Sequence, residues 1–307
     1  MVSFLHKKYD SKKRGNNKKV KMKRKWKLWM IAFVVFVMTD IMMQSNRAEA
    51  KKRTFTVSSK TIPCSSSYRQ KPYYNKKTKQ YYMINSYMRR LSTTGGTLKL
   101  KKGTYKIPGT IYVPSNVKIV CANGVKIKKT KATGTKKVKS TKFLFQMISE
   151  EKASGKQNTG KYAASKNASI QGNGKVIFDM GNVNGATAVF VGHASGITVS
   201  GVRFRNKKGG SYIWIEGSKN ISVRQCVFER KKDVSGLKNR MAVRLETSNQ
   251  TTSDFSGKWY KKDNTVNKKV KIENNQFLGA VVGFGPTKAV VFEKITQPNE
   301  FFQTGIT

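Results

Sequence analysis

Three charged residues in two short apolar stretches could carry out acid–base chemistry, and two of them, both glutamates, occupy matching positions. Glu216 lies at the end of "YIWIE", and "AVRLE" contains Arg244 and ends in Glu246. Two carboxyl groups about 5 to 9.5 Å apart are what glycoside hydrolysis requires. An arginine beside a uronate carboxylate could instead abstract a proton in a lyase reaction. The third possibility is that both glutamates are surface carboxylates paired with some of the many lysines.

Strand alternation places these residues on one side of a sheet. Alternate side chains of a strand face opposite sides, so the aliphatic residues of both stretches face the core and the others face outward. The outward positions predict one exposed stripe over successive strands: Asp179, Phe190, Trp214, Glu216, Arg244 and Glu246. Aromatic rings stack on sugar rings and charged groups hold hydroxyls or uronates. The stripe therefore predicts a sugar-binding groove, with Phe190, Trp214 and Asp179 as substrate contacts.

The strands belong to a repeated unit. The segments "GITVSGVRF", "NISVRQCVF" and "KVKIENNQF" align with apolar residues at spacings of two, three and two. A step of three reverses the strand parity, so the chain must bend where the extra residue lies, at Gly201, Gln225 and Asn274. Glycine and asparagine adopt left-handed backbone angles readily, which favours a sharp corner at these positions.

Repetition of this unit predicts an all-β solenoid, a single-stranded right-handed parallel β-helix over residues 95–307. A β-sandwich is the alternative, but it would not repeat the same apolar columns and corner. Residues 51–94 are predicted to form an N-terminal extension with a capping helix at "KQYYMINSYMRRL". Tyr81, Ile84, Met88 and Leu91 share one face of that helix, which would cover the open end of the solenoid.

The charge of the chain predicts a polyanionic partner. The sequence carries 62 Lys and Arg against 15 Asp and Glu, a formal net charge of +47, which exceeds what solubility needs. Nucleic acid is one candidate partner, but the N-terminus indicates export and disfavours a specific nucleic-acid role. We therefore expect a polysaccharide or another anionic polymer as the partner.

Residues 1–50 have the features of a signal peptide. A basic run and a short apolar core precede "AEA", with Ala48 and Ala50 at the small positions of a cleavage site. An uncleaved membrane anchor is the alternative, but the apolar run is shorter than the roughly 20 residues that a span requires. We expect a secreted or surface-associated protein that contacts the membrane only through this segment. Removing 13 positive and 3 negative side chains leaves 49 minus 12, or +37.

No resident metal or cofactor is expected. The chain has 2 histidines, and its 3 cysteines do not make a disulfide framework. Calcium has little support, because the carboxylates are few and the aspartates are not clustered. We expect a monomer that is stabilised by its core.

The segments "GGTLKLKKGTYKIPGTIYVPSNVKI" and "NASIQGNGKVIFD", followed by the bent repeats, resemble the pectate-lyase-like superfamily of secreted β-helix proteins. The resemblance runs from Tyr73 to Phe284 and is strongest toward a bacterial group of exported β-helix proteins. It implies the fold but no reaction, because the superfamily contains lyases, hydrolases, epimerases and adhesins. The aspartate cluster and G-H-G segment of polygalacturonases are missing, and "GSY" replaces an expected "SGH".

Among the histidines that the resemblance leads us to expect, His193 is the one that this chain keeps, which implies a substrate-binding role. The missing positions imply a divergent or truncated member. The expected function is therefore a carbohydrate-active protein that acts on or binds an anionic, uronate-type polysaccharide. The alternative is a non-catalytic, adhesin-like surface protein that binds cell-wall or extracellular polyanions.

Overall fold

The computed structural model describes residues 53–155, 159–230, 240–250, 255 and 257–284, together with Met30 and the backbone of 291–296 and 301–303. The predicted signal peptide, including Ala48 and Ala50, lies outside the described residues except for Met30. Within the described part of the chain, no helix is long and apolar enough to cross a membrane.

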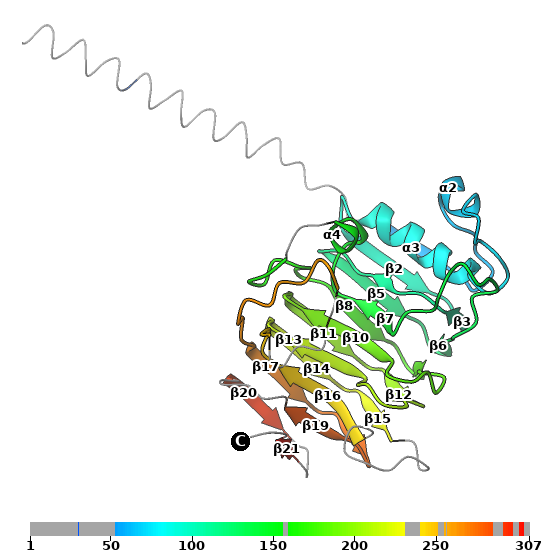
Figure 1. Ribbon diagram of the computed structural model, residues 1–307. Helices are drawn as coiled ribbons and strands as arrows, with labels where there is room; N and C mark the ends of the chain where they lie inside the picture. The colour runs from blue at the N-terminus through cyan, green and yellow to red at the C-terminus, as the bar shows by residue number, and fades with distance from the viewer. Residues whose placement is uncertain are drawn as a thin grey trace, which may run out of the picture. The chain divides into compact units, whose positions relative to one another are not determined.

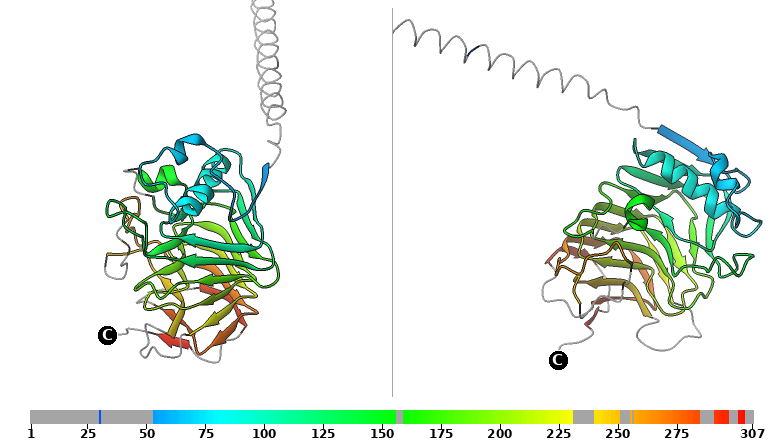
Figure 2. Two further views of the ribbon diagram at one scale, coloured as in Figure 1. Left: turned by 90° about the vertical axis from the view of Figure 1, so that its right-hand side faces the viewer. Right: turned by 45° about the horizontal axis from the view of Figure 1, so that its top comes forward.

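The described strands form three sheets that wind into a solenoid (Figures 1 and 2). Sheet 1 contains β1 (Arg53–Val57), β2 (Gly96–Leu100), β5 (Val117–Cys121), β8 (Ser169–Gly172), β11 (Ser195–Ser200), β14 (Lys219–Arg224), β17 (Lys268–Glu273) and β20 (Val291–Thr296). Sheet 2 contains β4 (Ile111–Tyr112), β7 (Phe143–Gln146), β10 (Thr187–Gly192), β13 (Ile213–Glu216), β16 (Met241–Glu246), β19 (Val281–Phe284) and β21 (Phe301–Gln303). Sheet 3 contains β3 (Gly103–Ile107), β6 (Val125–Lys129), β9 (Ile177–Asp179), β12 (Arg203–Arg205), β15 (Val227–Glu229) and β18 (Gln276–Leu278).

Each turn of the solenoid passes through sheet 1, sheet 3 and sheet 2 before it re-enters sheet 1 one rung further along. The strands β11, β12 and β13 make one such turn, and they pair with β14, β15 and β16 of the next turn in parallel. This arrangement is a parallel β-helix, as the repeated columns predicted.

The predicted corners lie between sheets 1 and 3. Gly201, Gln225 and Asn274 have backbone φ angles of 67°, 54° and 54°. A residue with left-handed backbone angles turns the chain sharply at one position. A strand of sheet 3 can therefore follow a strand of sheet 1 directly. The two-three-two spacing was therefore a correct signal of the bend.

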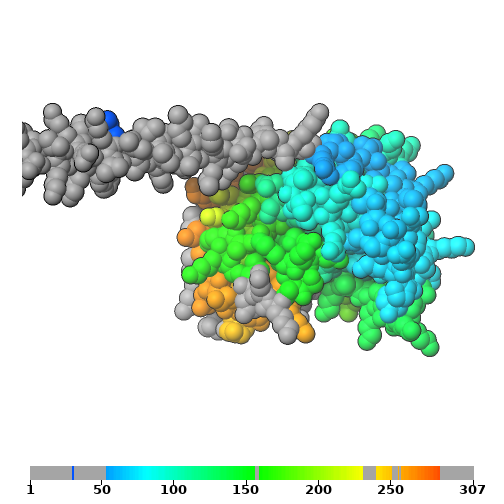
Figure 3. Space-filling model, turned by 90° about the horizontal axis from the view of Figure 1, so that it is seen from above, coloured from blue at the N-terminus to red at the C-terminus, as the bar shows by residue number. Residues whose placement is uncertain are grey.

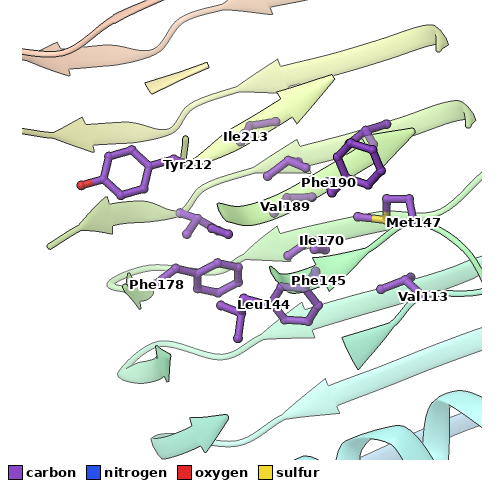
Figure 4. Packing of buried hydrophobic residues seen from close by; sticks show 14 of the residues in the cluster. Val113, Leu144, Phe145, Met147, Ile170, Phe178, Val189, Phe190, Tyr212 and Ile213 are labelled. Carbon is purple, nitrogen blue, oxygen red and sulfur yellow. The ribbon is translucent and has the colours of Figure 1, made fainter. Parts of the chain in front are cut away.

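The core lies inside the solenoid and consists of columns of like residues. Ile197, Ile221 and Val270 are paired in register, and all three are buried. On sheet 3, Phe204 and Phe228 stack with their ring centroids 5.1 Å apart. Figure 4 shows Phe178 and Phe145 facing each other across the interior, with centroids 5.4 Å apart. Burial of these columns is the main source of stability of the fold.

The capping helix is present as α3 (Lys79–Leu91), which has the bounds of the predicted segment. Its residues Ile84, Met88 and Leu91 are buried, and the helix packs against β2, β3 and β4. The short helices α2 (Ser66–Arg69) and α4 (Glu150–Ser154) complete the described helices. Figure 3 looks onto this end of the solenoid, with the N-terminal residues in blue and cyan over part of it.

The solenoid begins earlier than Gly95. β1 pairs in register with β2, so the first strand of sheet 1 comes before the capping helix. A single five-residue strand followed by a helix carries no repeat, which is why the pattern in "RTFTV" did not reveal it.

Candidate functional site

The predicted stripe residues lie side by side on the outer face of sheet 2. Phe190, Trp214 and Arg244 are register partners on β10, β13 and β16. Glu216 and Glu246 are partners two residues further along. We use "the stripe" for these five residues. Their common phase and adjacency are as predicted, because strands in register project equivalent side chains from the same face.

The expectation that the stripe is exposed is wrong for four of its five residues; the side chain of Arg244 is 22% exposed. Phe190 and Glu216 are fully buried, Glu246 is 1% exposed and Trp214 is 6% exposed. The covering residues come from the connection between β16 and β17, which spans residues 247–267, whereas β13 and β14 are joined by residues 217 and 218 alone. We call Phe255 together with residues 257–265 "the cover".

Aromatic rings of the cover fill the space over the stripe. The ring of Phe255 stacks on that of Phe190 with centroids 4.3 Å apart. Trp259 and Tyr260 lie 6.3 Å and 6.0 Å from the same ring. The protein's own side chains thus occupy the places where sugar rings were expected to stack. Three aromatic residues in the otherwise polar "FSGKWYKKD" were the sequence signal that could have revealed the cover.

Glu246, Arg244 and Trp214 bind one another through an ion pair, a cation–π contact and a hydrogen bond. The guanidinium of Arg244 pairs with Oε1 of Glu246, and its Cζ lies 4.4 Å from the centroid of the Trp214 ring. The indole Nε1 of Trp214 donates a hydrogen bond of 3.0 Å to Oε2 of Glu246. Both oxygens of Glu246 therefore already have partners within the protein, so a substrate would have to compete with Arg244 and Trp214 for them.

Glu216 lies beneath Tyr260. Burial, followed by the nearby charge of Glu216, raises the pKa of the Tyr260 hydroxyl above its usual range. Tyr260 therefore stays protonated, and both Tyr260 and the neighbouring Glu216 are buried. A substrate would have to displace this side chain before it could come within hydrogen-bond reach of Glu216.

His193 anchors the cover. Its Nε2 atom lies 2.6 Å from the carbonyl oxygen of Lys261 and 3.1 Å from Oγ of Ser248, and the Ser248 hydroxyl donates to the same carbonyl at 2.8 Å. Because a carbonyl oxygen can only accept, Nε2 carries the proton. Burial lowers the pKa of His193, so the ring is held neutral.

Ser248, His193 and Asp263 gather in one place without forming a catalytic triad. Oδ1 of Asp263 lies 4.0 Å from Nε2 of His193, the nitrogen that already faces Ser248, whereas a triad carboxylate holds the opposite ring nitrogen. Burial would raise the pKa of Asp263, but hydrogen bonds from the side chain and backbone of Thr265 outweigh it, and the pKa is lowered. The cluster therefore fixes the cover in place.

Asp179 does not belong to the stripe. It lies on β9 in sheet 3, because the strand "IFD" follows a corner and not a sheet 2 connection. Its carboxylate is 3.1 Å from Nζ of Lys126 and 3.5 Å from Nε of Arg205, and it accepts a 3.0 Å hydrogen bond from Asn206. Burial would raise its pKa, but the bonds from Asn206, Gly181 and Lys126 lower it. The predicted sugar contact is part of an ion-pair cluster.

In the described part of the chain, no three His, Cys, Asp or Glu side chains gather as a metal site would require. Roles of the stripe residues, Asp179 and His193 in binding or catalysis stay predictions. Their geometry is that of groups that hold the protein together.

Comparison with known proteins identifies the fold. No protein-family profile matches the chain, and no curated protein matches it. The crystal structure of PfbA, a surface adhesin of Streptococcus pneumoniae, superposes with a TM-score of 0.51 at 14% sequence identity, covering 75% of this chain and 52% of that one. A second structure of the same adhesin gives 0.45 at 17% identity, covering 75% and 64%. The chain thus spans about half the length of the first PfbA structure, with which it shares the parallel β-helix fold.

Proposed function

We propose that this chain is a non-catalytic, strongly basic β-helix protein of the cell surface or exterior that binds anionic polymers. The observation that carries the proposal is the occupation of the stripe by the cover. Glu216 and Glu246 are buried, and Glu246 is bound by Arg244 and Trp214. Neither carboxylate is available to a polysaccharide chain.

The positive charge supports binding as the main activity. Lysines at outward positions of the sheets, such as Lys99, Lys106 and Lys118, are exposed. A formal net charge of +47 attracts polyanions through long-range, salt-sensitive forces that do not depend on sequence. The cationic surface is thus free for a ligand, whereas the acidic stripe is not.

The fold is compatible with this role. PfbA, which shares the fold, is a surface adhesin, so a β-helix of this kind is suited to presentation at a cell surface. Membership of the pectate-lyase-like superfamily, suggested by the sequence, would add acidic glycans to the ligands to be tested. Export through residues 1–50 belongs to the same proposal.

Hydrolysis or elimination by Glu216, Glu246 and Arg244 is the competing function. It requires the cover to leave the stripe, with loss of the His193 contact to Lys261 and of the ring stack between Phe190 and Phe255. Nothing in the described contacts weakens these interactions. Binding without turnover is therefore the function that the geometry supports best.

The test combines binding and turnover in one preparation. Full-length protein is applied to immobilised polygalacturonate, wall teichoic acid and heparin in about 50 mM salt and eluted toward about 1 M, where the Debye length falls to about 3 Å. The same glycans are incubated with the protein and assayed for new reducing ends and unsaturated products. We expect salt-dependent retention and no product. Cleavage that is lost in Glu216→Gln would overturn the proposal.

A further inference from the structure

A groove of about 620 Å³ lies on the outer corner between sheets 1 and 3, away from the stripe. It crosses three successive rungs, from the β8–β9 connection through Gly201 to Gln225. Successive rungs are about 4.8 Å apart, so a ligand lying across them would contact side chains of all three turns. The volume is within the range of sites that hold a few sugar-sized units.

Glycine lets two adjacent rungs approach closely beside the groove. Gly172 and Gly201 form the corner on adjacent rungs, and their backbones touch: a Cβ on Gly172 would lie 2.1 Å from the carbonyl oxygen of Gly201. No side chain fills the corner on these two rungs. The turn 173–175 forms the wall beside this corner. There the backbone amide of Lys175 donates a hydrogen bond of 2.8 Å to Oδ1 of Asn123. The groove is therefore built from backbone that the neighbouring rung holds in place.

Arginine is concentrated in the part of the sequence that contributes two arginines to this groove. The chain has 13 arginines and 49 lysines, and 6 of the arginines lie between residues 203 and 244, while residues 91–202 contain none. Arg203 and Arg205 line the groove together with Lys175. A guanidinium presents a planar fork that fits a carboxylate in two hydrogen bonds, which a lysine ammonium cannot do. The arginines thus add a specific contact to the diffuse charge of the lysines.

The two arginines are half exposed and already held by carboxylates. Arg203 pairs with Glu229, and its side chain is 41% exposed. Arg205 lies 3.5 Å from Asp179, and its side chain is 34% exposed. These carboxylates hold the guanidinium groups in place, and each arginine side chain still lines the groove and is partly exposed. Lys126, which also pairs with Asp179, brings the cluster to four cations against two carboxylates.

Half-buried aliphatic residues flank Arg203 on both neighbouring rungs. Ile177 and Val227 are its register partners, and both line the groove. Aliphatic surface beside a cationic fork suits a sugar ring, which presents an apolar C–H face and polar substituents at its edge. We infer that this groove binds the carboxylate groups of an extended acidic polysaccharide, with Arg203 and Arg205 as the contacts to its uronic acid residues.

Other polyanions fit the groove less well. The strands beneath it, β9, β12 and β15, are paired on both sides, so they offer no free edge to an acidic peptide strand. The described residues that line the groove include no aromatic residue, so among them the bases of a single-stranded nucleic acid would find no ring to stack on. A carboxylated glycan remains the ligand that its chemistry favours.

The inference rests on the proposed polyanion binding, and the experiment separates the two. Full-length Arg203→Gln/Arg205→Gln is compared with Lys99→Gln/Lys118→Gln, which removes the same charge from the exposed face of sheet 1. The probes are polygalacturonate and, as a polyanion without carboxylates or sugar rings, polyphosphate. We expect the arginine variant to bind polygalacturonate at least tenfold more weakly than the lysine variant, while both lose polyphosphate binding equally.

A second variant guards against misfolding. Lys175→Gln changes an exposed turn residue and leaves both arginine ion pairs intact, so it should fold normally and still weaken polygalacturonate binding more than either lysine change alone. Equal losses in groove and control variants would overturn the groove assignment and leave the polyanion proposal standing. Wild-type protein that binds neither probe would overturn both.

Discussion

The Nε2 atom of His193 and the carbonyl oxygen of Lys261 lie 2.6 Å apart, although 68 positions separate them in the chain. This contact ties the end of β10 to the middle of the cover. It explains why a histidine that resembles a substrate contact in the sequence is buried in the structure. The bond holds the cover over the stripe and thereby decides against the stripe as an open site.

Shortening this side chain should loosen the cover. His193 has a φ of 49°, so His193→Asn keeps a residue that tolerates this angle and removes the bond to Lys261. We expect the free energy of unfolding to fall by about 1 to 3 kcal/mol. Trypsin should cleave faster after Lys258 and Lys261, as peptide mapping would detect. Asn173→Ala, at an exposed turn, is the control, and equal cleavage rates in the two variants would contradict the role of His193.

Acid should weaken the same anchor. Burial lowers the pKa of His193 from 6.5, so the unfolded chain takes up a proton at a pH where the folded protein does not. Its contribution to stability is therefore present above about 6.5 and is lost as the pH falls through the lower folded value. The free energies of unfolding of wild type and His193→Asn, measured with urea between pH 8 and pH 5, should differ less as the pH falls. A difference that widens would show that the folded state prefers the charged ring.

Lys129 should make stability depend on pH in the alkaline range. The side chain is fully buried, and Nζ lies 2.8 to 3.0 Å from the carbonyl oxygens of Pro108, Gly109 and Phe143. Burial lowers its pKa from 10.5 to about 7. Between these values the unfolded chain binds the extra proton, so the free energy of unfolding should rise with pH. In Lys129→Met the free energy of unfolding should rise less with pH than in the wild type. An unchanged pH dependence would contradict a lowered pKa of Lys129 in the folded protein.

Substitutions at two equivalent corner positions, Gly201 and Gln225, should differ in their effect on stability. In Gly201→Ala the new Cβ would lie 2.3 Å from the carbonyl oxygen of Gly172 at a φ of 67°, so we expect a loss of more than about 1 kcal/mol. Gln225→Gly relieves a left-handed glutamine at the next corner and should change stability by less than about 1 kcal/mol. Thermal unfolding of both variants measures the difference. Similar melting temperatures would show that the corner is not strained.

The sequence predicted those parts of the structure that repeat. The columns headed by Ile197 and Phe204 and the corner at Gly201 follow from spacing alone, because each rung imposes the same geometry on the next. The capping helix follows from the apolar residues that share one of its faces. The register that aligns Glu216 with Glu246 follows for the same reason. The cover did not follow, because residues 247–267 have no period, and burial of an outward face by an inserted connection leaves no mark on the strands beneath it.

The groove also escaped prediction, for a related reason. Arg203 and Arg205 flank Phe204, and only the inward Phe204 recurs on the next rung, as Phe228, whereas Arg203 is aligned with Val227. The groove is lined by residues of three successive rungs, among them Gly172 and Gly201, so it is a property of stacking and not of any one segment. Asp179 was misplaced because a strand after a corner and a strand of sheet 2 share the same short alternating pattern.

Shortening an aromatic side chain of the cover tests whether the stripe beneath it can cleave a glycan once it is uncovered. Phe255→Ala removes the ring stacked on Phe190, which should cost about 3 to 5 kcal/mol of stability. It should also make Trp214 more accessible to acrylamide quenching, measured in a background in which the other three tryptophans, Trp26, Trp29 and Trp259, are replaced by Phe. We expect no gain in glycan turnover. Cleavage of a glycan by this variant, abolished by a further Glu216→Gln change, would reveal a functional catalytic pair beneath the cover.

The most direct test of the account is one titration of the wild-type protein against polygalacturonate, with affinity and product formation followed together at increasing salt. A non-catalytic cationic surface predicts affinity that falls by at least tenfold between about 50 mM and 200 mM salt, with no new chain ends at any concentration. Salt-independent affinity, or product that accumulates with time, would contradict it.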